Sequence, residues 1–261
     1  NKITEPAIFA FMRYITLISF ILIITACGRQ KSAPDAEQLV MSSLWFQNSA
    51  EARALYYQAY NIARLRIELA LDTLDDNNKY AVVADIDETI LDNSPSEARN
   101  ILEGERYSNE RWMAWTSEAK AQLMPGSLDF ANFLKDRGVE LYYISNRSVD
   151  EKDVTLANLK KFGFPFADDK HVLLKEEESS KTPRRTLVEE SHQIILLLGD
   201  NLNDFSDIFE NRSEALGFST VDQVKNLFGS RFIVLPNPIY CSWTRALFGP
   251  ISDLSPRELA R

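Results

Sequence analysis

The sequence predicts an α/β protein with a parallel sheet, helices on both of its faces, and a smaller, mainly helical domain or cap. Three short apolar runs are each followed at once by polar residues: 80–84 by Asp85, 141–144 by Ser145, and 194–198 by Gly199-Asp200. Helical patterns lie between these runs, an alternation that favours right-handed βαβ units. Ligands bind at the carboxyl ends of the strands in such sheets, so we expect the three polar clusters to meet in one crevice.

The first 27 residues have the pattern of an export signal. Arg13 precedes an apolar run that is shorter than the ~20 residues of a membrane-spanning helix. Ile24-Thr-Ala-Cys27 resembles a bacterial lipobox, which implies removal of the leader and lipidation of Cys27. An ordinary signal peptide or a membrane anchor is the alternative. Met12 is an alternative start of translation, which would leave residues 1–11 untranslated.

The segment that follows predicts a tether and then helices. Residues 28–35 are small and polar, as in a flexible tether. Residues 36–79 contain apolar residues at helical spacing, which predicts two amphipathic helices with a break near residues 47–49. Their aromatic residues are interpreted as core residues: Trp45, Tyr56, Tyr57 and Tyr60. This helical segment is expected to form part of the small α domain, with the catalytic domain at 80–261.

Composition excludes some functions. The formal net charge of −9 argues against a nucleic-acid partner, which would need clustered Lys and Arg. Two His and two Cys make no Cys-rich or His-rich metal site, so a bound metal would be a hard ion held by oxygen. If Cys27 carries lipid, Cys241 has no cysteine left to pair with.

The rest of the chain continues the alternation. Helices are predicted at 128–137 and 150–162, because each pattern stops at a glycine, Gly138 or Gly163. Further strands are predicted at 172–174 and 232–235. Residues 93–125 are too long for a minimal strand-to-helix loop. They are interpreted as a cap insertion.

Asp85 and Asp87 are the central pair of carboxylates. Strand alternation places them on one side and Ile86 on the other, in the core. Two like charges this close repel, and one pKa rises unless a cation lies between them. The pair therefore indicates a site for a cation.

Taken together, these residues resemble the haloacid dehalogenase (HAD) superfamily, with its Rossmann-like sheet, and more narrowly the bacterial class C acid phosphatases of the lipoprotein-e type. Four motifs carry the resemblance in order: Asp85-Ile-Asp87-Glu-Thr89, Ser145, Lys181, and Gly199-Asp200-Asn201-Leu-Asn203-Asp204. The flanks 87–95, Ser145-Asn146-Arg147, Trp112-x-x-Trp115 and Pro236-Asn-Pro-Ile-Tyr240 support the narrower family. The resemblance covers the chain from Cys27 onward.

The resemblance implies the roles of the catalytic residues. Asp85 would be the nucleophile and Asp87 the general acid and base. Mg²⁺ would be held by Asp85, the backbone carbonyl of Asp87 and Asp200, with Asp204 behind them holding metal-bound waters. Ser145 would donate a hydrogen bond to phosphate. Lys181 would neutralise it, with Lys175 as the rival candidate.

The substrate side is predicted less sharply. Thr89 and Asn146 are interpreted as orienting residues, and Arg147 as a phosphate or substrate ligand, with a surface salt bridge as the equal alternative. Trp112 and Tyr240 match aromatic positions that sandwich a base or aryl group in the narrower family. Core packing is the alternative for Trp112, and the favoured interpretation for Trp115.

The resulting functional expectation is a lipid-anchored, Mg²⁺-dependent acid phosphatase or 5′-nucleotidase of the cell envelope, in the outer membrane facing the periplasm. Its partners would be small phosphomonoesters, such as nucleoside monophosphates and aryl phosphates, and the membrane that holds the lipid. Alternatives left open are a HAD sugar phosphatase of narrow specificity, a phosphotransferase, or a surface lipoprotein that binds a ligand. The oligomeric state stays open, with a homodimer among the options.

Overall fold

The computed structural model describes residues 34–73, 75, 77–212 and 215–248. These residues belong to one compact unit, Ala33–Arg261. Cys27, the predicted leader and most of the predicted tether lie outside the described residues. Within the described ranges, none of the helices combines the length and the apolar character needed to cross a membrane.

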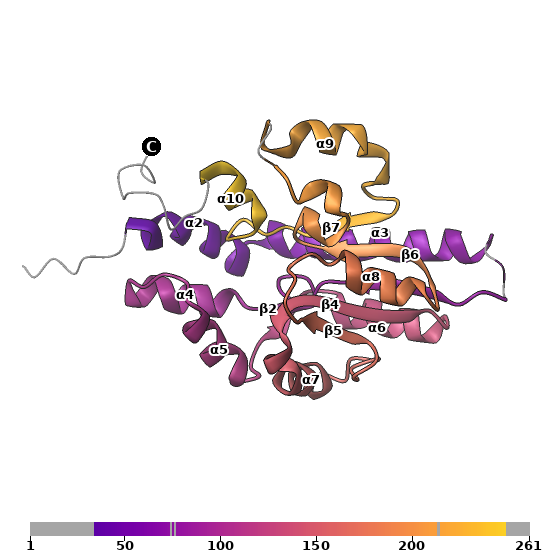
Figure 1. Cartoon of the computed structure of the whole chain (residues 1–261). Coiled ribbons are helices and arrows are strands. Elements are labelled where there is room, and N and C mark those ends of the chain that lie inside the picture. Colours follow the sequence, from indigo (N-terminus) through magenta and orange to yellow (C-terminus); the bar gives the residue numbers. More distant parts are fainter. Residues whose placement is uncertain (1–33, 74, 76, 213–214, 249–261) are drawn as a thin grey trace, which may run out of the picture. The chain divides into compact units, whose positions relative to one another are not determined.

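The centre of the fold is a five-stranded parallel sheet (Figure 1), which confirms the predicted sheet type, and the structure gives its strand order as β5-β4-β1-β6-β7. The strands are β1 (Tyr80–Ala84), β4 (Glu140–Ser148), β5 (Val172–Lys175), β6 (Gln193–Gly199) and β7 (Phe232–Val234). Strand β4 continues beyond the predicted end at Ile144, because after a register shift Ser148 pairs with Lys175 of β5. Ser145 and Arg147 therefore lie within a strand.

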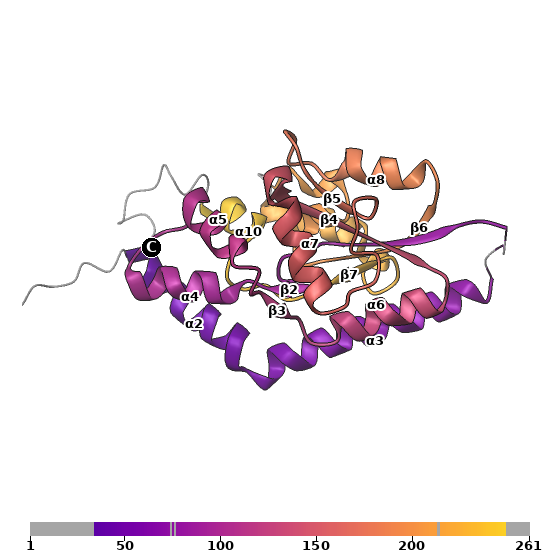
Figure 2. The same ribbon diagram turned by 90° about the horizontal axis from the view of Figure 1, so that it is seen from below.

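Helices cover both faces of the sheet. On one face lie α3 (Ala50–Leu71), α6 (Ser127–Asp136) and α7 (Lys152–Lys161), with α3 and α6 side by side (Figure 2). The other face is covered by α8 (Thr182–Glu189), α9 (Phe218–Gln223) and short 3-10 segments. Alternate residues of β1 supply the two cores, with Val82 and Ala84 in one and Ala81 and Val83 in the other. This alternation is the strand period of two.

The predicted helical segment consists of α2 (Pro34–Asn48) and α3, with the break at the predicted place. Ser49 begins α3 as an N-cap: its side chain accepts a hydrogen bond from the backbone N of Ala52 at 3.0 Å. Tyr56 and Tyr60 are buried, as predicted for core aromatics, while Tyr57 is exposed. Helix α3 thus shares its core with the sheet.

The predicted insertion, 93–125, contains α4 (Ser94–Glu103), α5 (Asn109–Ser117) and β3 (Gln122–Leu123), and β3 pairs antiparallel with β2 (Leu91–Asp92) just before the insertion. Helix α4 packs against α2 and ends at Gly104, whose φ of 68° is left-handed. The remaining elements are η1 (Val149–Glu151), η2 (Leu202–Asp204), η3 (Asp207–Phe209), η4 (Ala215–Gly217), η5 (Lys225–Leu227) and α10 (Ser242–Phe248).

Candidate active site

The loop after β1 is held from outside the sheet by two tyrosines of α3. The Tyr60 hydroxyl donates to the carbonyl of Thr89 at 2.7 Å. The Tyr56 hydroxyl contacts the carbonyl of Glu88 and, at 3.1 Å, that of Pro236 beyond β7. Glu88 has a φ of 53°, a left-handed conformation that non-glycine residues rarely adopt. These hydrogen bonds attach the strained loop, which carries the two carboxylates of the motif, to helix α3.

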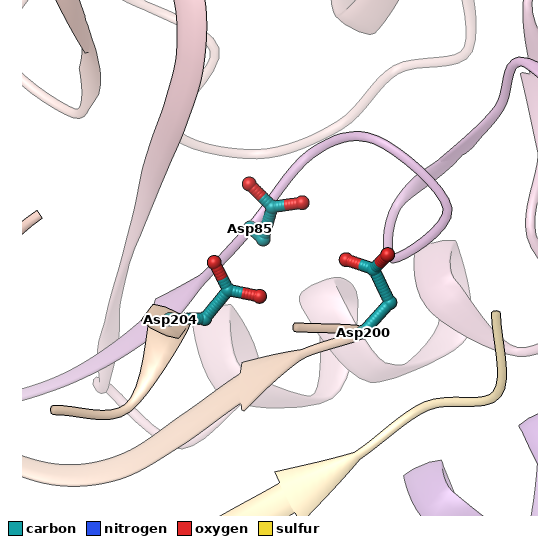
Figure 3. Close-up of side chains that lie close together, drawn as sticks. All are labelled: Asp85, Asp200 and Asp204. Carbon is teal, nitrogen blue, oxygen red and sulfur yellow. The ribbon is translucent and has the colours of Figure 1, made fainter. Parts of the chain in front are cut away.

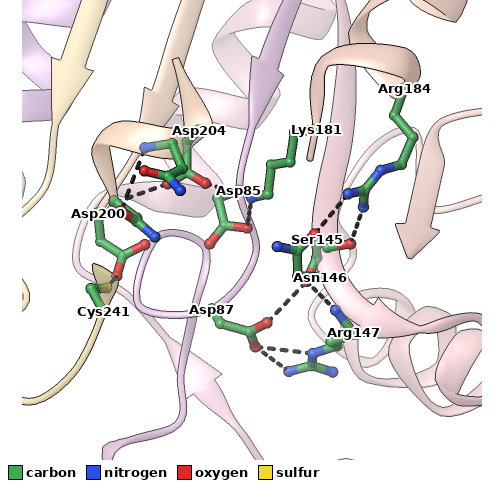
Figure 4. A network of polar contacts seen from close by, with 12 residues as sticks. Asp85, Asp87, Ser145, Asn146, Arg147, Lys181, Arg184, Asp200, Asp204 and Cys241 are labelled. Atoms are coloured by element: carbon green, nitrogen blue, oxygen red, sulfur yellow. Dashed lines mark hydrogen bonds and ion pairs between the residues drawn. The ribbon is translucent and has the colours of Figure 1, made fainter. Parts of the chain in front are cut away.

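Asp85 follows β1 and is paired with Lys181, which precedes α8. The Asp85 side chain is buried, and the Lys181 ammonium forms ion pairs with it and, at 2.7 Å, with Oδ1 of Asp204 (Figure 4). Lys175, the rival candidate, ends β5 and is half-buried. Of the two lysines, Lys181 is therefore the one that the structure places on Asp85.

Three carboxylates converge beside that lysine. Oxygens of Asp85, Asp200 and Asp204 lie within 4.8 Å of one another (Figure 3). A Cβ at Gly199 would lie 2.2 Å from Oδ2 of Asp204, so only glycine fits at the end of β6. Asp204 is further fixed by the backbone N of Asn201, which donates to it at 2.9 Å.

This cluster has more negative than positive charge, because three carboxylates lie beside the single ammonium group of Lys181. Burial raises the pKa of Asp85 well above its usual range; Lys181 opposes this, while Asp204 and Asp200 add to it. Burial and Asp204 raise the pKa of Asp200 to about 6. Three carboxylates facing one ammonium fit a hard divalent cation held by oxygen. This donor set agrees with the predicted cofactor class.

Asp200 is held by two residues that the sequence analysis did not assign. Asn237 donates to Oδ2 of Asp200 at 2.7 Å, and the Cys241 thiol donates to the same oxygen at 2.8 Å. Burial, followed by the charge of Asp200, raises the pKa of the Cys241 thiol. The only sequence signal for this arrangement was the polar Asn237 between two prolines.

Asp87 is surrounded by hydrogen-bond donors and lies outside the three-aspartate cluster. Ser145 donates to its Oδ2 at 3.0 Å. Its Oδ1 accepts from Arg147 Nε at 2.9 Å and Nη2 at 2.8 Å (Figure 4). The same oxygen accepts from Asn93 Nδ2 at 2.7 Å. Donors on both oxygens fix the direction of this carboxylate.

In this structure, Ser145 and Arg147 therefore donate their hydrogen bonds to the Asp87 carboxylate. The Arg147 side chain is 1% exposed, and its remaining nitrogen, Nη1, donates to Thr155 at 3.2 Å. The guanidinium carbon lies 5.7 Å from the centroid of the Trp112 ring. The predicted alternative of a surface salt bridge is wrong, because this ion pair is buried. A contact of Arg147 with substrate stays a prediction.

The two predicted orienting residues differ in exposure. Thr89 is fully buried, and its hydroxyl has no hydrogen-bond partner among the described residues. Asn146 is exposed, and its Oδ1 accepts from Arg184 Nη2 at 2.7 Å. Arg184 also donates to the carbonyl of Ser145 at 2.6 Å. Arg184 lies in α8 just beyond Lys181, a position the sequence analysis did not consider.

The two predicted stacking residues lie on different elements. Trp112 is half-buried on α5, with the Tyr107 ring 6.5 Å away. Tyr240 is half-buried in the loop before α10, and its buried hydroxyl has no hydrogen-bond partner in the described part of the chain. A sandwich formed by these two rings stays a prediction.

Comparison with known proteins agrees with this geometry. The family model of the HAD superfamily, subfamily IIIB (acid phosphatase), matches residues 28–243. The class C acid phosphatase from Bacillus anthracis has a similar structure, with a TM-score of 0.81 and 39% sequence identity; the match covers 86% of this chain and 94% of that one. The same enzyme with tungstate bound gives a TM-score of 0.81 at 39% identity, over 85% of this chain and 93% of that one.

Plant proteins are more distant relatives. The stem 28 kDa glycoprotein of Glycine max is 26% identical over 203 residues, which are 74% of this chain and 69% of the relative. Acid phosphatase 1 of Solanum lycopersicum is 26% identical over 176 residues, 64% of this chain and 61% of that protein.

Proposed function

This chain belongs to the acid phosphatases of HAD subfamily IIIB, and from that premise we propose that it is a Mg²⁺-dependent 5′-nucleotidase acting through a phosphorylated Asp85. That it is a phosphomonoester hydrolase follows from the family. The metal, the intermediate and the substrate are the proposal. The observation that carries it is the buried Asp85, paired with Lys181 beside Asp200 and Asp204.

The proposed reaction has two steps. In the first, a carboxylate oxygen of Asp85 attacks phosphorus, the bond to the leaving oxygen breaks, and Asp87 gives that oxygen its proton. In the second, Asp87 takes a proton from water as the water attacks phosphorus, and the bond between phosphorus and the Asp85 oxygen breaks. Inorganic phosphate leaves, and both aspartates return to their initial state.

Charge on the phosphoryl group would be balanced by neighbouring side chains. Lys181 is already within bonding distance of Asp85 and Asp204, so its ammonium lies where a transferring phosphoryl group would develop charge. The Ser145 hydroxyl lies on the neighbouring strand β4 and can turn from Asp87 to a phosphoryl oxygen. Both are donors of the kind that this chemistry requires.

The proposed metal ligands are Asp85, the backbone carbonyl of Asp87, and Asp200, with Asp204 behind them. The cluster of acidic oxygens and its raised pKa values support a divalent cation. Bound there, Mg²⁺ would polarise the phosphoryl oxygen and lower the repulsion between nucleophile and phosphate. The related enzyme with bound tungstate, a tetrahedral oxyanion, supports an oxyanion site in this family.

The proposed substrates are nucleoside monophosphates and aryl phosphates. Trp112 and Tyr240 would stack on the base, with Thr89, Asn146 and Arg147 orienting the phosphate end. Stacking tolerates different bases, so specificity would be broad. Attachment to the outer membrane through lipid on Cys27 is proposed from the lipobox alone.

Trapping the intermediate tests the proposal. The enzyme would be mixed with 4-nitrophenyl phosphate and Mg²⁺, and the reaction would be quenched in acid. Mass spectrometry would then measure the mass of the intact protein. We expect an added phosphoryl group, more abundant in Asp87→Asn, whose second step lacks its base. Borohydride reduction and peptide mapping should place the group on Asp85. Turnover without any phosphorylated enzyme, or a phosphoryl group on another residue, would contradict the proposed mechanism. Faster hydrolysis of hexose phosphates than of AMP would contradict the proposed specificity.

A further inference from the structure

Asn93 occupies the N-cap position of α4 but makes no side-chain capping bond. Asparagine at this position ordinarily accepts a hydrogen bond from the first turn of the helix. Here Asp92 takes that function, since its Oδ1 accepts from the backbone N of Ser94 at 2.9 Å. The Asn93 amide is only 2% exposed and is directed elsewhere, which calls for another role.

The two ends of that amide connect helix α5 to Asp87. Nε1 of Trp115, on α5, donates to Asn93 Oδ1 at 2.9 Å. On its other side, Asn93 Nδ2 donates to Oδ1 of Asp87 at 2.7 Å. The Trp115 ring is buried in the core beneath the insertion, so its indole N–H has a fixed direction.

The indole determines which way the amide faces. An indole N–H can only donate a hydrogen bond, so it selects the carbonyl oxygen of Asn93. Arg147 Nη2 approaches the same oxygen at 3.3 Å. If the amide were reversed, its oxygen would face the Asp87 carboxylate and its NH₂ would face two donors. Both contacts would be repulsive in a buried setting.

We propose that Asn93 is a positioning residue: Trp115 fixes its amide so that Nδ2 holds the Asp87 carboxylate in place for proton transfer to the leaving oxygen. This rests on the proposed function, in which Asp87 is the general acid. Proton transfer depends on placing the acid within hydrogen-bond reach of the leaving atom. Trp112, the proposed stacking residue, lies one helical turn before Trp115 on α5, so one helix would serve both the leaving group and the acid.

The test separates leaving groups that need a proton from one that does not. Trp115→Phe keeps a ring in the core and removes only the N–H and part of the ring volume. Its kcat/KM, which reports the steps up to departure of the leaving group, would be measured on AMP, an alkyl phosphate and 4-nitrophenyl phosphate. General acid catalysis contributes about 10²–10⁴-fold, so a misplaced acid should cost about tenfold on AMP and the alkyl phosphate and less than about twofold on 4-nitrophenyl phosphate.

Thr116→Val is the matched control. It alters the next buried residue of α5, whose hydroxyl contacts only the carbonyl of Met113 among the bonds found, and should leave all three kcat/KM values unchanged. Asn93→Ala should reproduce the leaving-group pattern, and adding Trp115→Phe to it should change nothing further, because both act on one contact. Asn93→Ala also carries the test if Trp115→Phe lowers Tm below the assay temperature.

Two results would overturn the proposal. One is an equal loss on all three substrates in Trp115→Phe or Asn93→Ala, which would indicate a structural role only. The other is wild-type kinetics in Asn93→Ala. Failure of the underlying function looks different: Asp87→Ala itself would then show no leaving-group dependence, or no phosphoryl group would be found on Asp85.

Discussion

Two carboxylate clusters with opposite electrostatics lie at the two ends of the parallel sheet, one at the start of β4 and the other beyond the carboxyl ends of β1 and β6. At its start, Glu140 Oε2 accepts from Lys170 Nζ at 2.6 Å and from His171 Nε2 at 2.9 Å, with His192 Nε2 at 3.2 Å. Burial raises the pKa of Glu140, but these partners outweigh it and lower the pKa to about 2. At the other end of the sheet, Asp85 and Asp204 share Lys181 with Asp200 beside them, and burial raises the pKa of Asp85.

The difference indicates that the charges around Glu140 stabilise the fold, whereas the charges around Asp85 are arranged to bind a ligand. The Glu140 cluster is complete within the chain, because one carboxylate is bound by a lysine and a histidine and lies beside a second histidine. The Asp85 cluster is incomplete, because carboxylates outnumber ammonium groups. An arrangement that costs free energy in the isolated protein persists where a ligand or a reaction completes it. Four experiments test this contrast.

Asp85→Asn should have the largest effect, and only on activity. We expect kcat/KM to fall by roughly 10⁴-fold or more, since the amide is a poor nucleophile. The free energy of unfolding should change by no more than about 1 kcal/mol, because the substitution also relieves repulsion in the cluster. Phosphate release and urea unfolding measure the two quantities. Near-full activity of the variant with Mg²⁺ present would refute the assignment of the nucleophile.

Removal of divalent cations should inactivate the enzyme and lower its stability. Chelation should abolish phosphate release, and Mg²⁺ should restore it. At about 100 times its Kd, a ligand of the folded state adds about 2.7 kcal/mol of stability, visible as a rise in Tm. Asp200→Asn should lose this response, while Glu140→Gln should keep it. An unchanged Tm and full activity after chelation would argue against a metal in the cluster.

In chelator, stability should rise as the solution is made mildly acidic. The folded-state pKa of Asp200 is raised to about 6 from an ordinary value of 3.8. A raised pKa contributes stability below the unfolded value, which is lost as pH rises through about 6. We therefore expect the free energy of unfolding to increase by about 1–3 kcal/mol between about pH 7 and about pH 5. Urea titrations measure it, and Asp200→Asn should flatten the slope; a wild-type slope of the opposite sign would contradict the prediction.

Glu140→Gln should have the smallest effect, and only on stability. The depressed pKa of Glu140 contributes stability above its ordinary value of 4.5, lost as pH falls towards about 2. Since the carboxylate is partly exposed, we expect a loss of about 1 kcal/mol at neutral pH and a shallower acid transition. Urea unfolding and phosphate release are the measurements. A large loss of activity with a wild-type free energy of unfolding would reverse the contrast between the two ends.

The sequence predicted the parts of the site that depend on strand order. Apolar runs that end in Asp85, Ser145 and Asp200 determine a parallel sheet with polar residues at one edge, and that sheet is confirmed. The choice of Lys181 over Lys175 depended on spacing to the last motif. The end of α6 before Gly138 followed from the glycine signal, and the break before α3 lies at the predicted residues 47–49.

The remaining contacts could not be predicted, because periodicity reports burial and not the partner of a buried polar group. In the sequence, Asn93 is only part of the flank 87–95, yet in the structure its amide donates to Asp87. Trp115 was interpreted as a core aromatic, which is correct for its ring. That interpretation does not identify the acceptor of its N–H, which is Asn93 Oδ1. Arg184 and Asn237 depend on where loops after different strands meet, which only the folded chain specifies.

The Tyr56 hydroxyl contacts the carbonyls of both Glu88 and Pro236. Pro236 lies 180 positions after Tyr56 in the chain. During synthesis, α3 leaves the ribosome before any strand of the sheet, but the contact with Pro236 forms only after β7 has been made. The catalytic loop is thus held by a bond that joins an early helix to a segment made after the whole sheet. A fragment that starts at β1 would keep every catalytic aspartate and still lack the two tyrosine hydroxyls that bind the carbonyls of Glu88 and Thr89.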